Sequence, residues 1–260
     1  MNIVVPVKSV IDVELNIRVR DGKVVEDGMN YILSKWDENA VEAALQIKEA
    51  VGGEVTVISV GPERAGEVLR KALAMGADKA VHVNDPAVEG SDSFGYARVL
   101  AAAIGRDSYD LVITGRQAQD TDMGGTGPIL AEMLGWPQVV NVVQVEPAEG
   151  QLTVQRKGDV GVEVFDVKLP ALLTANDSLN EPRLASLRGI MGAKKKPMET
   201  LTLSDLGVDA GQVGSDGARA EIVEFAPPKG REAGRKFEGE PDEVAKEVAE
   251  LLVNEAKIFS

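Results

Sequence analysis

Short apolar runs that alternate with helical patterns most strongly limit how this chain can fold. Nearly continuous apolar runs occupy residues 2–8, 54–61, 79–83 and 110–115. Such runs are typical of strands that are buried on both faces of a sheet. Patterns with apolar residues at helical spacing follow them, at residues 37–51, 62–75, 93–104 and 128–134. Strands that alternate with helices predict a Rossmann-like α/β fold, a parallel sheet with helices on both faces.

Two segments depart from this alternation. Residues 11–33 interrupt the order after the first strand, and their sequence predicts a hairpin that turns at Asp21-Gly22. After residue 136 the chain has strand patterns without helices between them, at residues 139–146, 151–157, 162–168 and 170–176. We expect these strands to form a β-rich continuation of the same sheet.

The C-terminal part has a different character. Residues 203–240 are rich in Gly, Asp, Glu and Pro and show no sustained period, which predicts an extended arm without a core of its own. A last helix, at about 241–256, carries Val244, Val248, Leu251 and Leu252 on one side. The sequence therefore predicts an α/β domain over residues 1–200 and an arm over 201–260, which either clasps a partner or folds back on its own domain.

Composition excludes several classes of function. The formal net charge of -14 opposes non-specific binding to nucleic acid or to an anionic membrane surface. The chain has no cysteine, so it forms no disulfide, thiol nucleophile or Cys-ligated cluster. With His82 as the single histidine, a transition-metal site is not expected, and His82 itself is expected at a strand end rather than as a catalytic base.

The sequence also bears on location. No apolar run approaches the roughly 20 residues of a membrane-spanning helix. The N-terminus enters a strand at once, without a basic and then apolar leader. We therefore expect a cytoplasmic protein of a bacterium or archaeon.

A glycine-rich loop at residues 115–128, "GRQAQDTDMGGTGP", is the strongest candidate for ligand binding. Ligands of parallel sheets bind beyond the carboxyl ends of the strands, and this loop follows the fourth strand. Gly124, Gly125 and Gly127 would let the backbone approach an anion, and the helix that follows offers free N–H groups. The loop thus suits a phosphate, although glycines before a helix also form simple turns. Asp120 and Asp122 would repel a phosphate, so we expect them to face elsewhere.

Motifs for catalysis are absent from the sequence. The first strand is followed by "VPVKSVID" rather than Gly-x-Gly-x-x-Gly, and neither a Walker phosphate loop nor a Gly-x-Ser-x-Gly elbow occurs. The carboxylates suggest no catalytic centre. The sequence predicts a nucleotide-binding module that is not itself an enzyme.

Several long motifs, in order along nearly the whole chain, resemble the beta subunit of electron transfer flavoproteins. The most specific are "VPVKSVID", "VGPERAGEVLRKALAMGADKA", "DLVITGRQAQDTDMGGTGP" and "KLPALLTANDSLNEPRLASLRGIMGAKKKP". The resemblance implies the adenine nucleotide alpha hydrolase-like version of the fold. It also implies a heterodimer in which the alpha subunit holds most of the redox-active FAD, while the beta subunit binds AMP in a structural role.

The resemblance further implies which residues contact AMP. By matching motifs these are Pro6, Ser34, Lys35, Trp36, Asp37, Val60, Gly115, Arg116, Gln117, Ala118, Gln119, Asp120, Thr121, Asp122, Met123, Gly124, Gly125 and Thr126. Pro6, Ser34, Lys35 and Val60 differ from the residue types of some family members, so their contacts would be made mainly by the backbone.

The segment at residues 178–197 resembles the family's recognition loop, which docks acyl-CoA dehydrogenases and similar flavoenzymes. The resemblance implies docking by Leu184, Leu187 and Arg188, with Leu187 as the leucine anchored in an apolar pocket of the partner, and Leu184 stands where other members have Tyr. We expect Ile190 and Met191 to pack on the core instead. The basic run Lys194–Lys196 either steers acidic partners or keeps a helix end soluble. The family also allows peripheral contact with a membrane quinone oxidoreductase.

Three alternatives to this prediction remain. A beta subunit of an electron-bifurcating flavoprotein would hold a second FAD in place of AMP and use NADH as donor. Its usual loop shares Asp120, Asp122, Gly127 and Pro128 with this chain but differs at the centre. A stand-alone ATP-binding or ATP-hydrolysing protein of the same fold would need a phosphate loop after the first strand, which is absent. The last alternative is a scaffold that binds no nucleotide.

Overall fold

The computed structural model describes residues 1–15, 17–148, 150–227, 229–230, 234–255 and 257–258. The chain divides into two compact units, Met1–Phe225 and Ala226–Ser260. The first unit contains every strand of the described residues and most of the helices.

The elements of the first unit follow the predicted alternation. The strands are β1 (Asn2–Pro6), β2 (Ser9–Ile11), β3 (Val19–Arg20), β4 (Lys23–Val24), β5 (Tyr31–Leu33), β6 (Glu54–Val60), β7 (Lys79–Val83), β8 (Leu111–Gly115), β9 (Gln138–Ala148), β10 (Gln151–Lys157), β11 (Val162–Lys168), β12 (Ala171–Ala175) and β13 (Met198–Leu201). The α-helices are α1 (Lys35–Val51), α2 (Ala65–Met75), α3 (Ser93–Ile104), α4 (Thr126–Leu134), α5 (Leu187–Ala193) and α6 (Gly214–Gly217), and the 3-10 helices are η1 (Pro86–Val88) and η2 (Ala210–Gln212).

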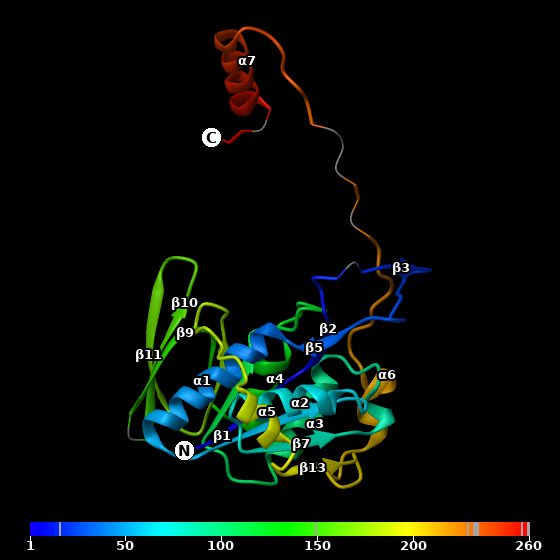
Figure 1. The fold of residues 1–260 in the computed structure, drawn as a ribbon, viewed down its shortest axis with the longest axis vertical. Coiled ribbons are helices and arrows are strands. Elements are labelled where there is room, and N and C mark those ends of the chain that lie inside the picture. Colours follow the sequence, from blue (N-terminus) through cyan, green and yellow to red (C-terminus); the bar gives the residue numbers. More distant parts are fainter. Residues whose placement is uncertain (16, 149, 228, 231–233, 256, 259–260) are drawn as a thin grey trace. The chain divides into compact units, whose positions relative to one another are not determined.

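One large sheet organises this unit (Figure 1). Among the described residues nine strands pair in the order β11-β10-β9-β12-β8-β1-β6-β7-β13. The strands from β9 to β13 in this order are parallel, as the helical connections predict. Strands β9, β10 and β11 pair antiparallel at one end, so the segment after residue 136 does continue the same sheet.

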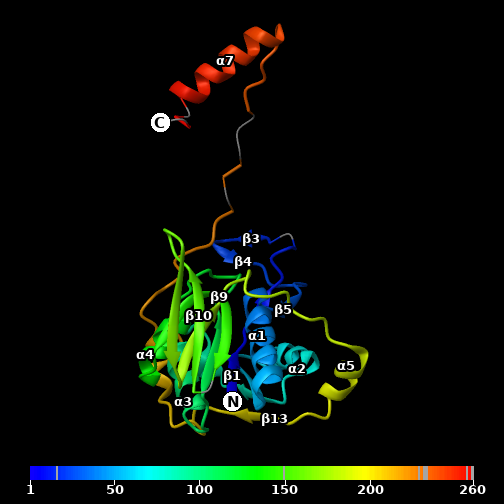
Figure 2. The ribbon, with the colours of Figure 1, turned by 90° about the vertical axis from the view of Figure 1, so that its left-hand side faces the viewer.

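Helices cover both faces of the sheet because its central strands are apolar on both sides. Ile3 and Val5 of β1 belong to one buried cluster with side chains of α1 and α2, whereas Val4 belongs to a second cluster with side chains of α3 and α4. Successive residues of a strand point to opposite faces, so a continuous apolar run requires two covered faces. Figure 2 shows α1 and α2 on one side of the sheet and α3 and α4 on the other.

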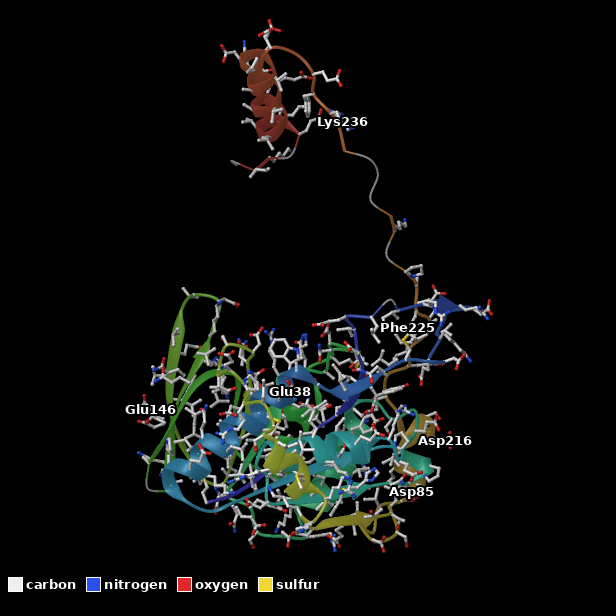
Figure 3. All side chains as sticks on the ribbon, viewed as in Figure 1. Glu38, Asp85, Glu146, Asp216, Phe225 and Lys236 are labelled. Carbon is white, nitrogen blue, oxygen red and sulfur yellow. The ribbon has the colours of Figure 1, made fainter. Side chains whose placement is uncertain are left out.

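The excursion after β1 forms two small antiparallel ribbons. Strand β2 pairs with β5, and β3 pairs with β4 around Asp21 and Gly22. Both turn residues have positive φ, +52° and +72°, as a tight two-residue hairpin requires. The backbone N–H of Phe225, which is labelled in Figure 3, donates to the carbonyl of Gly22 at 2.8 Å. The hairpin therefore contacts the end of the first unit.

The first unit extends beyond residue 200, where the sequence placed the start of an arm. Strand β13 pairs with β7 at the edge of the sheet, and Leu201, Leu203 and Val213 are buried in the cluster beneath α3 and α4. The side chain of Asp85 holds this segment, since its second carboxylate oxygen accepts from the backbone N–H of Leu203 at 3.1 Å. These apolar residues are too irregularly spaced to produce a pattern in the sequence.

The second unit contains helix α7 (Pro241–Asn254). Its apolar side chains Val244, Val248, Leu251 and Leu252 lie on one face and are partly exposed, and no described residue of α7 is buried. None of the helices in the described part of the chain is long and apolar enough to span a bilayer.

Candidate functional site

A cavity of about 790 Å³ lies at the carboxyl ends of the central parallel strands. The last residues of β1, β6 and β8, namely Pro6, Val60 and Gly115, all line it. The amino end of α4 lies against the same cavity through Thr126 and Gly127. This is the edge at which parallel α/β sheets bind ligands, because the loops that follow neighbouring strands meet there.

Many of the predicted AMP-binding residues line this cavity. They are Pro6, Asp37, Val60, Gly115, Arg116, Gln117, Ala118, Thr121, Met123, Gly124 and Thr126. The others are not among the lining residues, and these are Ser34, Lys35, Trp36, Gln119, Asp120, Asp122 and Gly125.

Three of the residues that do not line the cavity hold the loop that follows β8. The side chain of Gln119 accepts from the backbone N–H of Lys35 at 2.8 Å, which connects the loop to the start of α1. Asp120 forms an ion pair with Lys8 at 2.8 Å, and Asp122 accepts from the amide of Gln117 at 2.9 Å. The two aspartates are thus paired with other side chains of the site rather than directed at an anion in the cavity.

Small residues let helix α4 approach the sheet closely. A Cβ atom at Gly127 would lie 2.8 Å from the hydroxyl of Thr114 and 2.9 Å from a methyl group of Thr174. Gly124 has a φ of +63°, a conformation that favours glycine. The amino end of α4 therefore reaches the cavity, where its free N–H groups and helix dipole favour an anion.

The hydroxyl of Thr114 is a polar group without a partner. It is buried, it has no hydrogen bond within the described residues, and Thr114 lines the cavity. A buried polar atom without a partner is costly unless a ligand or water satisfies it. Thr114 thus lines the cavity, while its hydroxyl is enclosed where α4 packs on the sheet at Gly127.

Asp37 connects three elements beneath the cavity. From the first turn of α1, one of its carboxylate oxygens accepts from the backbone N–H of Lys8 at 2.8 Å, and the other accepts from that of Gly115 at 3.1 Å. Gly115 has no room for a side chain, since a Cβ there would lie 2.4 Å from the Asp37 carboxylate. One side chain therefore fixes to α1 both the last residue of β8 and the segment that follows β1.

The environment of Asp37 changes its acidity. Burial raises its pKa from 3.8 to about 7, although the two backbone N–H donors and the nearby ammonium of Lys8 favour the carboxylate. A group with this pKa changes charge near neutral pH, directly beneath the cavity.

Sequence reasoning missed two segments of the cavity wall. Residues 90–93 with Tyr96 form one of them, and Ser215 with residues 218–222 forms the other. Asp92 joins them. One of its oxygens caps α3 by accepting from Phe94 and Gly95, and the other accepts from the backbone N–H groups of Arg219 at 2.7 Å and Ala220 at 3.0 Å.

The electrostatics of Asp92 fit this joining role. Burial opposes its charge, but four backbone N–H donors outweigh this effect and hold its pKa below the usual range. The guanidinium of Arg219 lies 3.6 Å from the ring centre of Phe94. Asp92 before an apolar helix is a capping signal in the sequence. Its second set of partners, however, lies 127 and 128 residues later along the chain, and no local pattern reveals them.

His82 lies outside the cavity lining. It sits on β7, is 5% exposed, and has its Nε2 atom 3.0 Å from the carbonyl oxygen of Gly61. Within the described residues no group of three or more His, Cys, Asp or Glu side chains is arranged to hold a metal ion.

A second candidate surface lies on the segment before and within α5. The side chain of Leu184 is 95% exposed and that of Leu187 is 75% exposed, and Arg188 is exposed as well. Ser186 caps α5 by accepting from the N–H of Gly189 at 3.0 Å. A Cβ at Gly189 would lie 2.3 Å from the carbonyl oxygen of Ala74, so α5 packs closely on α2 (Figure 2).

The expectation that Ile190 and Met191 pack on the core is wrong. They are 50% and 67% exposed, because Gly189 and the buried Ala193 form the face of α5 that contacts α2. Lys196 has a structural position, since its ammonium donates to the carbonyl of Leu73 at 2.9 Å and to that of Ala77 at 2.5 Å, at the end of α2.

The pKa of Asp37 yields a prediction on stability. Because its folded pKa is about 7 and its ordinary value is 3.8, the folded chain binds more protons than the unfolded chain between these pH values. Asp37 therefore makes the free energy of unfolding fall as pH rises through this window, by at most about 1.4 kcal/mol per pH unit. Asp37→Asn should remove this contribution. Urea unfolding at pH 5, 6 and 7 measures it, and parallel pH profiles for the two proteins would contradict it.

Comparisons with known proteins extend this picture. A family model described as "Electron transfer flavoprotein domain" matches residues 21–206, more than half of the chain. A protein of Thermoanaerobacterium thermosaccharolyticum is 42% identical over 254 residues, which cover 97% of this chain and 98% of the relative. A protein of Bacillus subtilis is 40% identical over 260 residues and all of both chains, and one of Clostridium acetobutylicum is 39% identical over 258 residues, 99% and 98% of the two chains.

Each of these three relatives bears the name electron transfer flavoprotein subunit beta. The regions aligned with these relatives span nearly the whole chain. Because the family model covers most of the first unit and the identity holds over the whole length, this chain belongs to the electron transfer flavoprotein beta subunit family.

Proposed function

We propose that this chain is the non-catalytic subunit of a heterodimeric electron transfer flavoprotein. It binds AMP in the cavity, helps an alpha subunit hold FAD, and docks donor flavoenzymes through the segment around α5. The observation that carries the proposal is the presence of two separate features in one unit: a cavity with an anion-favouring helix end, and a pair of exposed leucines on a second surface.

The chemistry of the cavity supports AMP. The phosphate would lie at the amino end of α4, where Thr126 and the backbone of Gly124 line the cavity and Arg116 adds a positive charge. The volume of about 790 Å³ lies within the range of roughly 300–1,000 Å³ of small-molecule sites.

The proposed role is structural rather than catalytic, and the contacts of two carboxylates of the site support it. Asp37 is committed to two backbone N–H groups, and Asp120 is paired with Lys8. Bound FAD would supply the electron storage, and the residues of this chain would hold the nucleotide and shape the subunit.

The exposed leucines support docking of a partner flavoenzyme, such as an acyl-CoA dehydrogenase. Burial of one leucine side chain contributes about 1.5–3 kcal/mol, and a single anchor in a pocket often dominates a small interface. A small contact that dissociates readily suits a carrier that accepts an electron and leaves. With Lys196 engaged by α2, Lys194 and Lys195 of the basic run are exposed, and together with the exposed Arg188 they would steer an acidic partner.

The second unit supports contact with an alpha subunit. The apolar face of α7 is partly exposed within its own unit, and such a face on an amphipathic helix is commonly covered by another surface. We propose that this helix, with the chain that leads to it, clasps the alpha subunit.

A bifurcating beta subunit with a second FAD is the alternative that the cavity also accommodates by volume. Ligand analysis of the purified heterodimer separates the two functions. We expect one AMP and one FAD per heterodimer after denaturation and chromatography. Two FAD molecules and no AMP would overturn the AMP assignment in favour of bifurcation, and a heterodimer without nucleotide would indicate a scaffold.

Docking predicts a specific effect of Leu187→Ala. Electron transfer from a reduced acyl-CoA dehydrogenase should slow, with KM for the dehydrogenase raised about tenfold to a hundredfold, which corresponds to the loss of one buried leucine. AMP and FAD contents should stay unchanged. Val164→Ala on β11, which removes methyl groups from a side chain that is 61% exposed, is the matched control. Unchanged transfer in the Leu187 variant would refute the docking surface.

A further inference from the structure

The path of the chain between β12 and α5 depends on a few side-chain contacts. Residues 176–186 contain neither helix nor strand. Asn180 exchanges hydrogen bonds with Asn39 of α1: the amide of Asn39 donates to the carbonyl of Asn180 at 2.8 Å, and the amide of Asn180 donates to that of Asn39 at 3.0 Å. Between Asn180 and Ser186 the hydrogen bonds that connect this segment to other elements in the described structure all involve Arg183.

Arg183 forms hydrogen bonds and ion pairs with two glutamates of α1, Glu42 and Glu49. Its Nε and Nη2 atoms donate to the two carboxylate oxygens of Glu42 at 2.8 and 3.0 Å, and its backbone N–H donates to the same carboxylate at 3.1 Å. Its Nη1 and Nη2 atoms donate to the two oxygens of Glu49 at 2.5 and 3.1 Å. One guanidinium therefore forms bidentate pairs with two carboxylates, a geometry that only its planar fork provides.

The contacts of Arg183 with Glu42 and Glu49, called the clamp below, differ from an ordinary surface ion pair. Glu42 is only 4% exposed. Burial opposes its ionisation, but the hydrogen bonds from Arg183, with one from Gln46, outweigh that effect and hold the pKa of Glu42 below the usual range. A buried carboxylate that lost this partner would remain as an uncompensated charge, so the clamp is strongly favoured in the folded chain.

The clamp lies directly beside the exposed leucines. Leu184 follows Arg183 in the chain, and Leu187 begins α5. We propose that Arg183 is a positioning residue for partner docking, which holds Leu184 and Leu187 in their binding conformation through Glu42 and Glu49. The inference rests on the proposed docking function. Its physical basis is preorganisation, because a segment that is ordered before binding loses less conformational entropy when the complex forms.

The test uses the complete heterodimer and Arg183→Lys, which keeps the charge and loses the bidentate geometry. We expect KM for a reduced acyl-CoA dehydrogenase to rise about tenfold, with kcat, FAD content and AMP content unchanged. Arg156→Lys is the matched control, since Arg156 pairs with Glu163 on the β10–β11 hairpin at 2.5 Å. An unchanged KM in the Arg183 variant, or a change equal to that of the control, would overturn the proposal.

A double-mutant cycle with Leu187→Ala distinguishes positioning from general destabilisation. If Arg183 acts through the leucines, Arg183→Lys should have little further effect on KM in the Leu187→Ala background. Effects that multiply independently would overturn the positioning role. If Leu187→Ala alone leaves transfer unchanged, the docking function itself fails. If Leu187→Ala slows transfer and Arg183→Lys does not, docking stands and only the clamp is refuted.

A second variant keeps the proposal testable if Arg183→Lys does not assemble. Glu49→Gln removes the exposed carboxylate of the clamp and leaves the buried pair of Arg183 with Glu42 intact. In that case we expect a smaller rise in KM, about threefold, that disappears in the Leu187→Ala background. An assembled Glu49→Gln heterodimer with the KM of the unmodified protein would count against the proposal.

Discussion

The carboxylate of Asp37 joins three elements at the edge of the sheet where the cavity lies. Its two oxygens accept from the backbone N–H groups of Lys8 and Gly115, so one side chain of α1 fixes the segment after β1 and the last residue of β8. This geometry requires a residue without a side chain at position 115. The backbone of Gly115 and the carboxylate of Asp37 lie close together and both line the cavity. Burial of the Asp37 carboxylate raises its pKa.

Helix α1 connects the two candidate surfaces. Asp37 in its first turn supports the cavity, while Asn39, Glu42 and Glu49 further along hold the segment that carries the exposed leucines. A rigid helix that is buried along one face transmits a fixed spacing between its two ends. In the proposed carrier, α1 therefore keeps the nucleotide-binding cavity and the docking surface at a fixed distance from each other, although they lie on different loops.

Several parts of the site could be predicted from the sequence because they produce local sequence patterns. The apolar runs predicted β1, β6, β7 and β8, and the carboxyl ends of parallel strands predicted where Pro6, Val60 and Gly115 would meet. The cavity wall formed by residues 218–222 could not be predicted from the sequence. It depends on hydrogen bonds that Asp92 accepts from residues far along the chain. The exposure of Ile190 and Met191 was predicted wrongly, since helical spacing alone does not say which face of α5 meets α2.

The sequence by itself determined the α/β alternation, the two covered faces of the sheet, the hairpin at Asp21-Gly22 and the family resemblance, because each follows from local periodicity, turn chemistry or contiguous motifs. Only the tertiary structure decided the strand order, the burial of Leu201, Leu203 and Val213 near the sheet edge and the pairing of Arg183 with Glu42 and Glu49. These features join residues that are distant in the chain. The free energy that stabilises these features comes from burial and charge pairing in the folded state, and no local sequence pattern encodes it.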